Sequence, residues 1–328
     1  MPGNYGMSRR RVLGLAGLGA AGAVLAACSK PAAPATAGPT SPGASGSSGP
    51  STSPSPSDGL IRGSGQPVHT RFLQGDGSTW GVGMPIIAYL SAEIGDAHMF
   101  AKASKVTVNG SKVDGAWFFQ KSAVYPDYPV EARYRLDDYW PAHADIHLDL
   151  PVKGLTAGPN QVFDNSLTLD LKTGARNIAE IDGTSLRMTV TSDGQPKFTF
   201  PVSLGKAASP TFNGIKVVIS KAAVQHMVNN TPGNVYDLQV PWSVRVTNSG
   251  EFIHSASWNG GNIGTRSTSH GCTNLNEGDA KNYFDFAQIG DVTIYTNTGG
   301  PTMPSWDGYG DWNLAWATWQ TGGIYKIT

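Results

Sequence analysis

Apolar and polar residues alternate in short runs through most of the chain beyond residue 58, and Gly, Pro, Asn and Asp separate the runs. Such alternation, with few stretches long enough for a helix, is typical of a protein built mainly from β-strands. Lys105–Val108 and Asp145–Leu150 are two clear examples. We expect residues 59–174 to form an Ig-like β-sandwich, whose core includes the aromatic run Trp117-Phe118-Phe119.

The alternating pattern restarts at Arg176 and predicts a second domain rich in β-strands. Segments 185–190 and 197–200 flank the turn sequence Ser192-Asp193-Gly194-Gln195, which predicts a hairpin. The candidate core residues of that hairpin are Leu186, Met188, Val190, Phe198 and Phe200.

One helix is predicted within this second domain, from Glu277 to Ala287. Its apolar positions Ala280, Tyr283, Phe284 and Ala287 share one helical face. Asn276 can cap its start and Gly290 can end it. Residues 300–328 form a short Trp-rich C-terminal subdomain, in which the spacing of Trp312, Trp316 and Trp319 predicts a helical face that packs on the rest of the protein.

The N-terminal 28 residues have the pattern of an export signal. Three arginines, Arg9 to Arg11, precede a nearly uncharged apolar run over residues 12–27. That run falls short of the roughly 20 residues needed to span a bilayer. Ser8-Arg9-Arg10 resembles a twin-arginine signal, although the general secretion route also accepts a basic start. Leu25-Ala26-Ala27-Cys28 resembles a bacterial lipobox, which implies that Cys28 is lipidated and anchors the protein to the outer face of the membrane.

Residues 29–58 are almost entirely Pro, Ala, Ser, Gly and Thr, which predicts a disordered tether. The whole chain carries 24 basic and 24 acidic residues, so its formal net charge is zero. No basic stripe follows the signal, and a nucleic-acid partner is therefore not expected.

The most informative motif is Ser269-His270-Gly271-Cys272-Thr273-Asn274, which follows His254-Ser255. If Cys28 is lipidated, Cys272 has no disulfide partner, because the chain contains only two cysteines. A lone thiol beside two imidazoles suggests a nucleophile for acyl transfer. Pairing with an imidazolium would raise the thiolate fraction, which is only about 3% at pH 7 for a free thiol. The alternative is a buried cysteine that acts only as a small apolar residue.

Two histidines compete for the role of base. His270 is two residues from Cys272, and such neighbours on one strand rarely align well for a hydrogen bond. We therefore prefer His254, which can arrive from a neighbouring strand, and treat His270 as a structural or substrate-side group. The backbone carbonyl of Ser255 can fix the tautomer of His254. The N–H groups of Gly271 and Cys272 are candidate oxyanion donors.

With fourteen residues between His254 and Ser269, this motif resembles the signature of the L,D-transpeptidases, bacterial enzymes that remodel peptidoglycan. His254-Ser255-Ala256-Ser257-Trp258, the ending Gly308-Tyr309-Gly310-Asp311-Trp312-Asn313, the lipobox and the Ig-like domain are similar to the actinobacterial branch. The resemblance implies an L,D-transpeptidase-type catalytic β-sandwich over residues 175–299.

The resemblance also implies roles for individual residues. Cys272 would be the nucleophile, His254 the base, the Ser255 carbonyl its acceptor, and His270 and Gly271 would shape the site. Tyr236, Ser269 and Asn274 would lie on the substrate side, with Tyr236 supplying a hydroxyl or merely packing, and Asn274 fixing the loop. The family usually has an aliphatic residue where this chain has Thr273, a change that a half-exposed strand would tolerate.

The activity implied is attack by Cys272 on the bond between diaminopimelate and D-alanine in a tetrapeptide stem, followed by transfer to an amine of a second stem to give a 3-3 cross-link. Peptidoglycan stem peptides are then the partners, carbapenem β-lactams are inhibitors, and no cofactor is needed. Three alternatives stay open: a cell-wall cysteine peptidase or L,D-carboxypeptidase, a structural zinc site formed by His254, His270 and Cys272, and a non-catalytic wall-binding lipoprotein.

Overall fold

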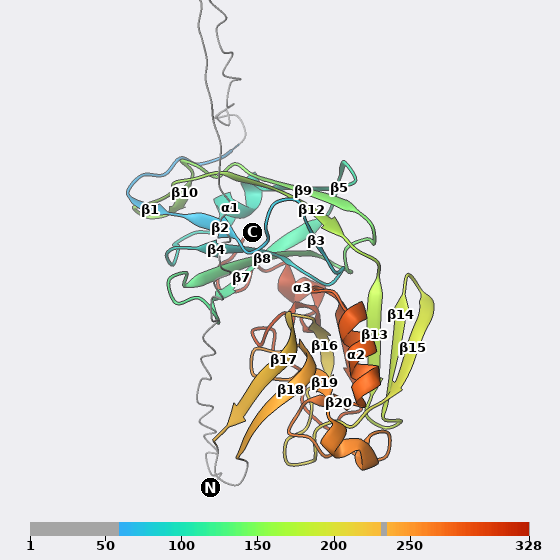
Figure 1. The fold of residues 1–328 in the computed structure, drawn as a ribbon. Coiled ribbons are helices and arrows are strands. Elements are labelled where there is room, and N and C mark those ends of the chain that lie inside the picture. The colour runs from blue at the N-terminus through green and yellow to red at the C-terminus, as the bar shows by residue number, and fades with distance from the viewer. Residues whose placement is uncertain (1–58, 231–234, 328) are drawn as a thin grey trace, which may run out of the picture. The chain divides into compact units, whose positions relative to one another are not determined.

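The computed structural model describes residues 59–230 and 235–327, which form several β-sheets and a few short helices (Figure 1). The predicted, mainly β fold class is therefore confirmed. The expected export signal, Cys28 and the tether over residues 29–58 lie outside the described residues. No helix within the described ranges is long and apolar enough to cross a membrane.

The first part of the described chain forms three sheets and one short helix. A four-stranded sheet has the order β2-β4-β8-β7, a five-stranded sheet has the order β3-β12-β9-β5-β6, and a three-stranded sheet has the order β1-β11-β10. The elements are β1 (Gln66–Val68), β2 (Thr70–Phe72), β3 (Ser78–Trp80), β4 (Ile86–Leu90), α1 (His98–Ala103), β5 (Lys105–Val108), β6 (Ser111–Lys112), β7 (Gly115–Lys121), β8 (Val130–Leu136), β9 (Asp145–Leu150), β10 (Thr156–Gly158), β11 (Gln161–Phe163) and β12 (Leu167–Thr173).

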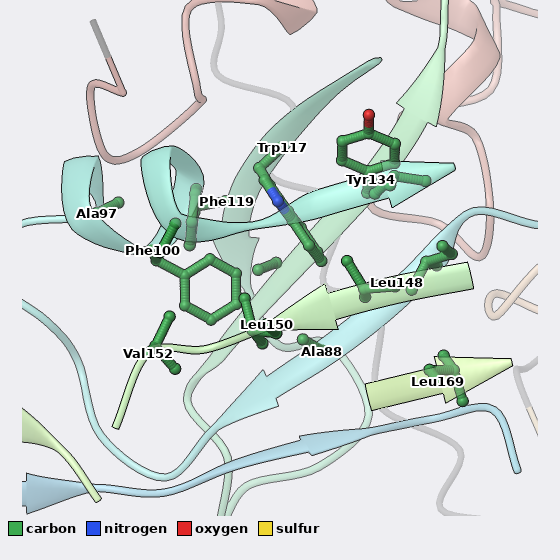
Figure 2. Packing of buried hydrophobic residues seen from close by; sticks show 14 of the residues in the cluster. Ala88, Ala97, Phe100, Trp117, Phe119, Tyr134, Leu148, Leu150, Val152 and Leu169 are labelled. Carbon is green, nitrogen blue, oxygen red and sulfur yellow. The ribbon is translucent and has the colours of Figure 1, made fainter. Parts of the chain in front are cut away.

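The core of this part lies between the four-stranded and five-stranded sheets. Phe100 of α1 is fully buried and meets Trp117 and Phe119 of β7 edge to face, with ring centroids 5.0 and 5.6 Å apart. Figure 2 shows the Phe100 ring beside Leu150 and Val152. Strands β7 and β9 thus pack face to face through alternate side chains, as expected for a sandwich. The predicted contribution of Trp117 and Phe119 to this core is confirmed.

The second part forms two sheets that carry the candidate site. One has the order β15-β14-β13-β21-β16 and the other has the order β17-β18-β19-β20. The elements are β13 (Asn177–Asp182), β14 (Arg187–Ser192), β15 (Gln195–Pro201), β16 (Gly214–Val217), β17 (Ser220–Asn229), β18 (Tyr236–Arg245), β19 (Phe252–Ser255), η2 (Ser257–Asn262), β20 (Thr273–Leu275), α2 (Glu277–Phe286) and β21 (Val292–Thr296). Figure 1 shows β17 and β18 as a long hairpin next to β19 and β20.

The hairpin and the helix predicted for this part are confirmed. Strands β14 and β15 pair antiparallel around Asp193-Gly194, and four of the five predicted core residues are buried while Phe198 is partly buried. Helix α2 buries Ala280 and Tyr283 and follows β20 directly. Asn276 occupies its N-cap position without a capping hydrogen bond from its side chain.

The single helix predicted for the three C-terminal tryptophans is wrong, but their predicted packing on the rest of the protein is confirmed, because all three rings lie against the Arg135 guanidinium of β8. The segment forms two short helices, η3 (Asp311–Asn313) and α3 (Trp316–Trp319), and Leu314 is extended between them. The side-chain amide of Asn313 donates to the carbonyls of Ile215 and Met303, which ties the chain down where a continuous helix would pass. Trp319 is fully buried and stacks on Phe118, with ring centroids 4.7 Å apart.

The C-terminal segment is held to β8 by buried charges. Arg133 contacts both Glu131 and Asp311, at 2.6 and 3.1 Å, and all three side chains are almost completely buried. Its guanidinium also donates to the carbonyl of Gly308 at 2.9 Å. We call Arg133, Glu131 and Asp311 the Arg133 cluster. It joins residues that are 178 positions apart in the sequence.

Candidate functional site

The backbone of the site is the parallel pairing of β19 with β20. Ile253, His254 and Ser255 lie opposite Thr273, Asn274 and Leu275. His254 therefore arrives on the strand next to the one that begins immediately after Cys272, as expected from the sequence. Strand β18 flanks β19 on its other side.

His254 is 4% exposed, and its orientation is fixed by the next residue. Its Nδ1 lies 2.7 Å from the carbonyl oxygen of Ser255, so Nδ1 carries the hydrogen and donates it. The Nε2 atom is then left with a lone pair. Burial lowers the pKa of His254 to about 4, so the imidazole is neutral at pH 7. The Trp258 ring lies nearly parallel to the imidazole, with centroids 6.0 Å apart. This geometry suits a general base.

Cys272 is partly exposed, and its thiol donates to the carbonyl of Gly250, with Sγ and the oxygen 3.7 Å apart. Burial of the sulfur raises the pKa of Cys272 to about 12. A hydrogen bond from the N–H of Phe252 acts in the opposite direction. The pairing with an imidazolium that would raise the thiolate fraction is therefore disfavoured in this site. Both groups are neutral, because each is removed from water by its surroundings.

The turn before Cys272 is held by a small hydroxyl network. Ser269 Oγ donates to the carbonyl of Cys272 at 2.6 Å and accepts from the N–H of Gly271 at 3.1 Å. Thr211 Oγ1 donates to the Gly271 carbonyl at 2.8 Å. Gly271 has φ +125°, which a residue with a Cβ rarely adopts.

This network corrects the expected pair of oxyanion donors. The N–H of Gly271 is already used by Ser269, because the turn directs it back into the loop. Among the hydrogen bonds of the described residues, none uses the N–H of Cys272. The N–H of Cys272 thus remains as the candidate donor from this turn.

His270 is exposed and faces a cation that the sequence analysis missed. Lys206 Nζ lies 2.8 Å from His270 Nε2, so that nitrogen accepts from the ammonium. Burial and the Lys206 charge both lower the pKa of His270, which favours the neutral ring. Such a ring has its Nε2 lone pair occupied, so His270 is poorly placed to act as a base. No local pattern marks Lys206, because the contact joins positions 64 residues apart.

Of the residues expected on the substrate side, Tyr236 lies nearest to this exposed edge. Its ring centroid is 5.9 Å from that of His270. Burial and the proximity of Cys272 raise its pKa. Ser269 and Asn274, in contrast, are 9% and 4% exposed. The backbone of Asn274 pairs with Ser203 through two hydrogen bonds of 2.8 and 3.1 Å, so Asn274 lies beneath the loop.

Thr273 is buried rather than half-exposed, with 1% of its surface accessible. The expectation was wrong because β20 is covered on both sides, and its three residues are all buried. The Thr273 hydroxyl finds a partner in the Tyr295 hydroxyl at 3.0 Å. A polar residue is accommodated at this position because a second polar residue faces it.

The described residues do not support the alternative of a structural zinc site. Within residues 59–230 and 235–327, no group of three His, Cys, Asp or Glu side chains is placed to hold a metal ion.

A neutral thiol immediately before β20 and a neutral, oriented imidazole on the adjoining strand β19 are typical of enzymes that transfer or hydrolyse acyl groups through cysteine. Comparison with known proteins narrows this class. Residues 176–295 match the L,D-transpeptidase catalytic domain and residues 56–156 match the bacterial Ig domain. The chain thus contains an L,D-transpeptidase catalytic domain preceded by a bacterial Ig domain, and it is homologous to the mycobacterial L,D-transpeptidases.

Individual relatives support this assignment. L,D-transpeptidase 2 of Mycobacterium tuberculosis is 32% identical over 76% of this chain and 61% of its own length. L,D-transpeptidase 5 of the same organism is 30% identical over 77% of this chain and 55% of its own length. The chain therefore spans less than two thirds of either relative. A solved L,D-transpeptidase in complex with imipenem is 25% identical with a TM-score of 0.58, over 72% of this chain and all of that one.

Proposed function

We propose that this protein is a peptidoglycan L,D-transpeptidase, with Cys272 as nucleophile and His254 as base. The observation that carries the proposal is the fixed tautomer of His254. Its Nδ1 hydrogen is donated to the Ser255 carbonyl, so Nε2 is free to accept a proton. His254 lies on β19, which pairs with β20, the strand that follows Cys272. These residues lie within the segment that matches the catalytic domain.

In the first half of the reaction, Cys272 Sγ attacks the carbonyl carbon of diaminopimelate in a donor tetrapeptide stem. Because the thiol and imidazole both start neutral, the S–H proton moves to His254 Nε2 as the carbon–sulfur bond forms. The tetrahedral oxyanion accepts a hydrogen bond from the N–H of Cys272. His254 then returns the proton to the leaving nitrogen, and D-alanine departs with a thioester left on Cys272.

In the second half, the side-chain amine of another stem attacks the thioester. His254 takes a proton from this amine and gives it to the departing sulfur, which restores the thiol and forms a 3-3 cross-link. Water in place of the amine would give L,D-carboxypeptidase activity through the same groups. The Tyr236 hydroxyl and the exposed His270 and Lys206 lie at the edge where a second stem would approach.

The partners and location follow from the same proposal. Stem peptides are the substrates, and no cofactor is required. Carbapenems would acylate the same thiol, in keeping with the imipenem complex of a similar structure. Lipidation of Cys28 would hold the enzyme at the outer face of the membrane, within reach of the cell wall.

The test is the intact mass of the protein after incubation with a carbapenem, for the wild type, Cys272→Ala and His254→Ala. We expect one adduct per chain in the wild type and none in Cys272→Ala. His254→Ala should form the adduct about 10² to 10⁴ times more slowly, the usual contribution of a positioned base. A normal adduct in Cys272→Ala would exclude Cys272 as the nucleophile.

A second assay separates transfer from hydrolysis. A tetrapeptide stem is supplied with and without a second stem as amine acceptor, and the products are identified by mass spectrometry. The proposal predicts a cross-linked dimer with release of D-alanine. Tripeptide alone, at any acceptor concentration, would instead identify a carboxypeptidase.

A further inference from the structure

A buried ion pair lies beside the nucleophile. Lys216 on β16 and Glu251 before β19 are 0% and 8% exposed, and Nζ lies 2.5 Å from Oε2. Buried ion pairs seldom stabilise a fold more than apolar residues of the same size would. Burial lowers the pKa of Lys216 and raises that of Glu251, while their contact opposes both changes. The pair therefore calls for an explanation other than stability.

The Glu251 carboxylate is inserted among the backbone segments that hold Cys272. Its second oxygen, Oε1, accepts from the N–H of Phe212 at 2.9 Å. The same oxygen would lie 3.5 Å from a Cβ built on Gly271, the residue before Cys272. Glu251 also directly follows Gly250, whose carbonyl accepts the thiol hydrogen of Cys272. The negative charge of Glu251 acts on the thiol of Cys272 and disfavours its ionisation.

The other member of the pair contacts Tyr295 on β21. Lys216 Nζ lies 3.6 Å from the centroid of the Tyr295 ring, a favourable position for a cation. The Tyr295 hydroxyl in turn contacts Thr273. The ion pair is thus linked to Thr273, the residue after Cys272, only through Tyr295.

Charged and titratable groups face this region from every neighbouring strand. Positive charges are Lys216 on β16 and Arg245 on β18, and both favour a thiolate at Cys272. Glu251 opposes it more strongly than either favours it. Tyr236 on β18 and Tyr295 on β21 also interact with Cys272, and Asp307 interacts with the ion pair. His254 lies on β19, the strand that pairs with β20.

We propose that Glu251, anchored by Lys216, is a positioning residue that keeps Cys272 as a neutral thiol until His254 accepts its proton. The thiol–carbonyl hydrogen bond to Gly250 has the same requirement, because only a protonated sulfur can donate. In an exported protein this protects the nucleophile, since the thiolate is the form that is oxidised and alkylated. The inference rests on the role proposed above for Cys272.

The experiment measures the rate of Cys272 alkylation by iodoacetamide between pH 6 and 10, in the full chain with Cys28→Ser so that Cys272 is the sole thiol. Glu251→Gln keeps an oxygen that can accept from Phe212 but removes the charge. We expect faster alkylation at each pH, on the order of tenfold, the effect of a one-unit fall in the thiol pKa.

Asp311→Asn is the matched control, because it also neutralises a fully buried carboxylate that contacts a cation, in the Arg133 cluster. It should lower stability without changing the alkylation profile. If Glu251→Gln fails to fold, the double variant Lys216→Met with Glu251→Met replaces the pair by apolar side chains of similar length. Its alkylation should still be faster than in the wild type, because Glu251 disfavours the thiolate more strongly than Lys216 favours it. The increase should be smaller than in Glu251→Gln, because the favourable charge of Lys216 is lost as well.

Unchanged alkylation profiles in folded Glu251→Gln and in the double variant would overturn the inference, as would an equal shift in Asp311→Asn. Alkylation reports on the thiol alone, so it separates this inference from the proposed function. A shifted alkylation profile in Glu251→Gln, together with no carbapenem adduct in the wild type, would support the effect of Glu251 on the thiol and contradict the proposed transpeptidase function.

Discussion

Two sets of paired charges are buried within residues 59–230 and 235–327, and they differ in what surrounds them. In the Arg133 cluster one guanidinium contacts two carboxylates and a backbone carbonyl, and nearly every polar atom of the cation points to a partner. In the Lys216–Glu251 pair one ammonium contacts one carboxylate, whose other oxygen faces the backbone around Gly271. The Arg133 cluster ties the C-terminal segment to β8, whereas the pair lies beside the turn that contains Cys272.

The difference shows that burial of a charged pair does not by itself reveal its role. Planar, multiply hydrogen-bonded Arg contacts fix geometry between distant segments. A single Lys–Glu contact next to a titrating group changes the energy of that group instead. Substitutions in the two regions should therefore separate stability from thiol chemistry.

The largest effect on stability is expected from Arg133→Met. It removes the cation and leaves Glu131 and Asp311 buried without their common partner. Breaking a buried pair in this way typically costs about 3 to 5 kcal/mol. Urea unfolding should show this loss, while the alkylation profile of Cys272 in the folded variant stays that of the wild type. A shifted profile would mean that the Arg133 cluster also acts on the site.

A buried carboxylate whose hydrogen bonds come from neutral donors offers a third case. Asp291 is 2% exposed, and its Oδ2 accepts from Asn177 and from the N–H of Gln288. Burial raises the pKa of Asp291 to about 7. As pH rises, the unfolded chain loses this proton first, so the stability contributed by the neutral acid is present below about pH 4 and is lost up to about pH 7.

Asp291→Asn should remove the loss of stability between pH 4 and pH 7 that is due to Asp291. His254, whose pKa is lowered, has the opposite trend, because its contribution is lost as pH falls from 6.5 towards 4. The difference between wild type and variant isolates Asp291 from this background. We expect the difference in unfolding free energy to change by about 3 kcal/mol from pH 4 to pH 7, at roughly 1.4 kcal/mol per pH unit. Parallel curves for the two proteins would show that Asp291 ionises normally.

The local parts of this architecture were predictable from the sequence. The turn Asp193-Gly194 and the apolar face of α2 are short-range signals, and both elements form as expected. The Cys272 motif and His254 were found because residue types and spacing along the chain carry that information. The carbonyl of Ser255 could be named because it belongs to the residue after His254.

The parts that were missed depend on contacts between distant segments. Lys206 meets His270 across 64 positions, and Lys216 meets Glu251 across 35. A lone Lys or Glu in a strand has no periodicity that reveals its partner. The tryptophan spacing was misleading for the same reason, because the side chain of Asn313 and the buried carboxylate of Asp311 determine the path of that segment.

The smallest expected effect comes from Thr273→Val, which changes a neutral member of the network around Cys272. Valine has the same shape but leaves the buried Tyr295 hydroxyl without its partner, at a cost of about 1 to 2 kcal/mol in urea unfolding. In the double variant with Tyr295→Phe the cost should be less than the sum of the two single costs, because both polar partners are gone.

The same variant tests whether charge or packing controls the thiol. Thr273 is adjacent to Cys272 in the chain but carries no charge, so Thr273→Val should change the alkylation rate less than twofold, against the roughly tenfold expected for Glu251→Gln. If a neutral substitution shifted the profile as far as the charged one, the thiol would be responding to small movements of β20. The contrast between the Lys216–Glu251 pair and the Arg133 cluster would then be one of distance from the sulfur rather than of electrostatics.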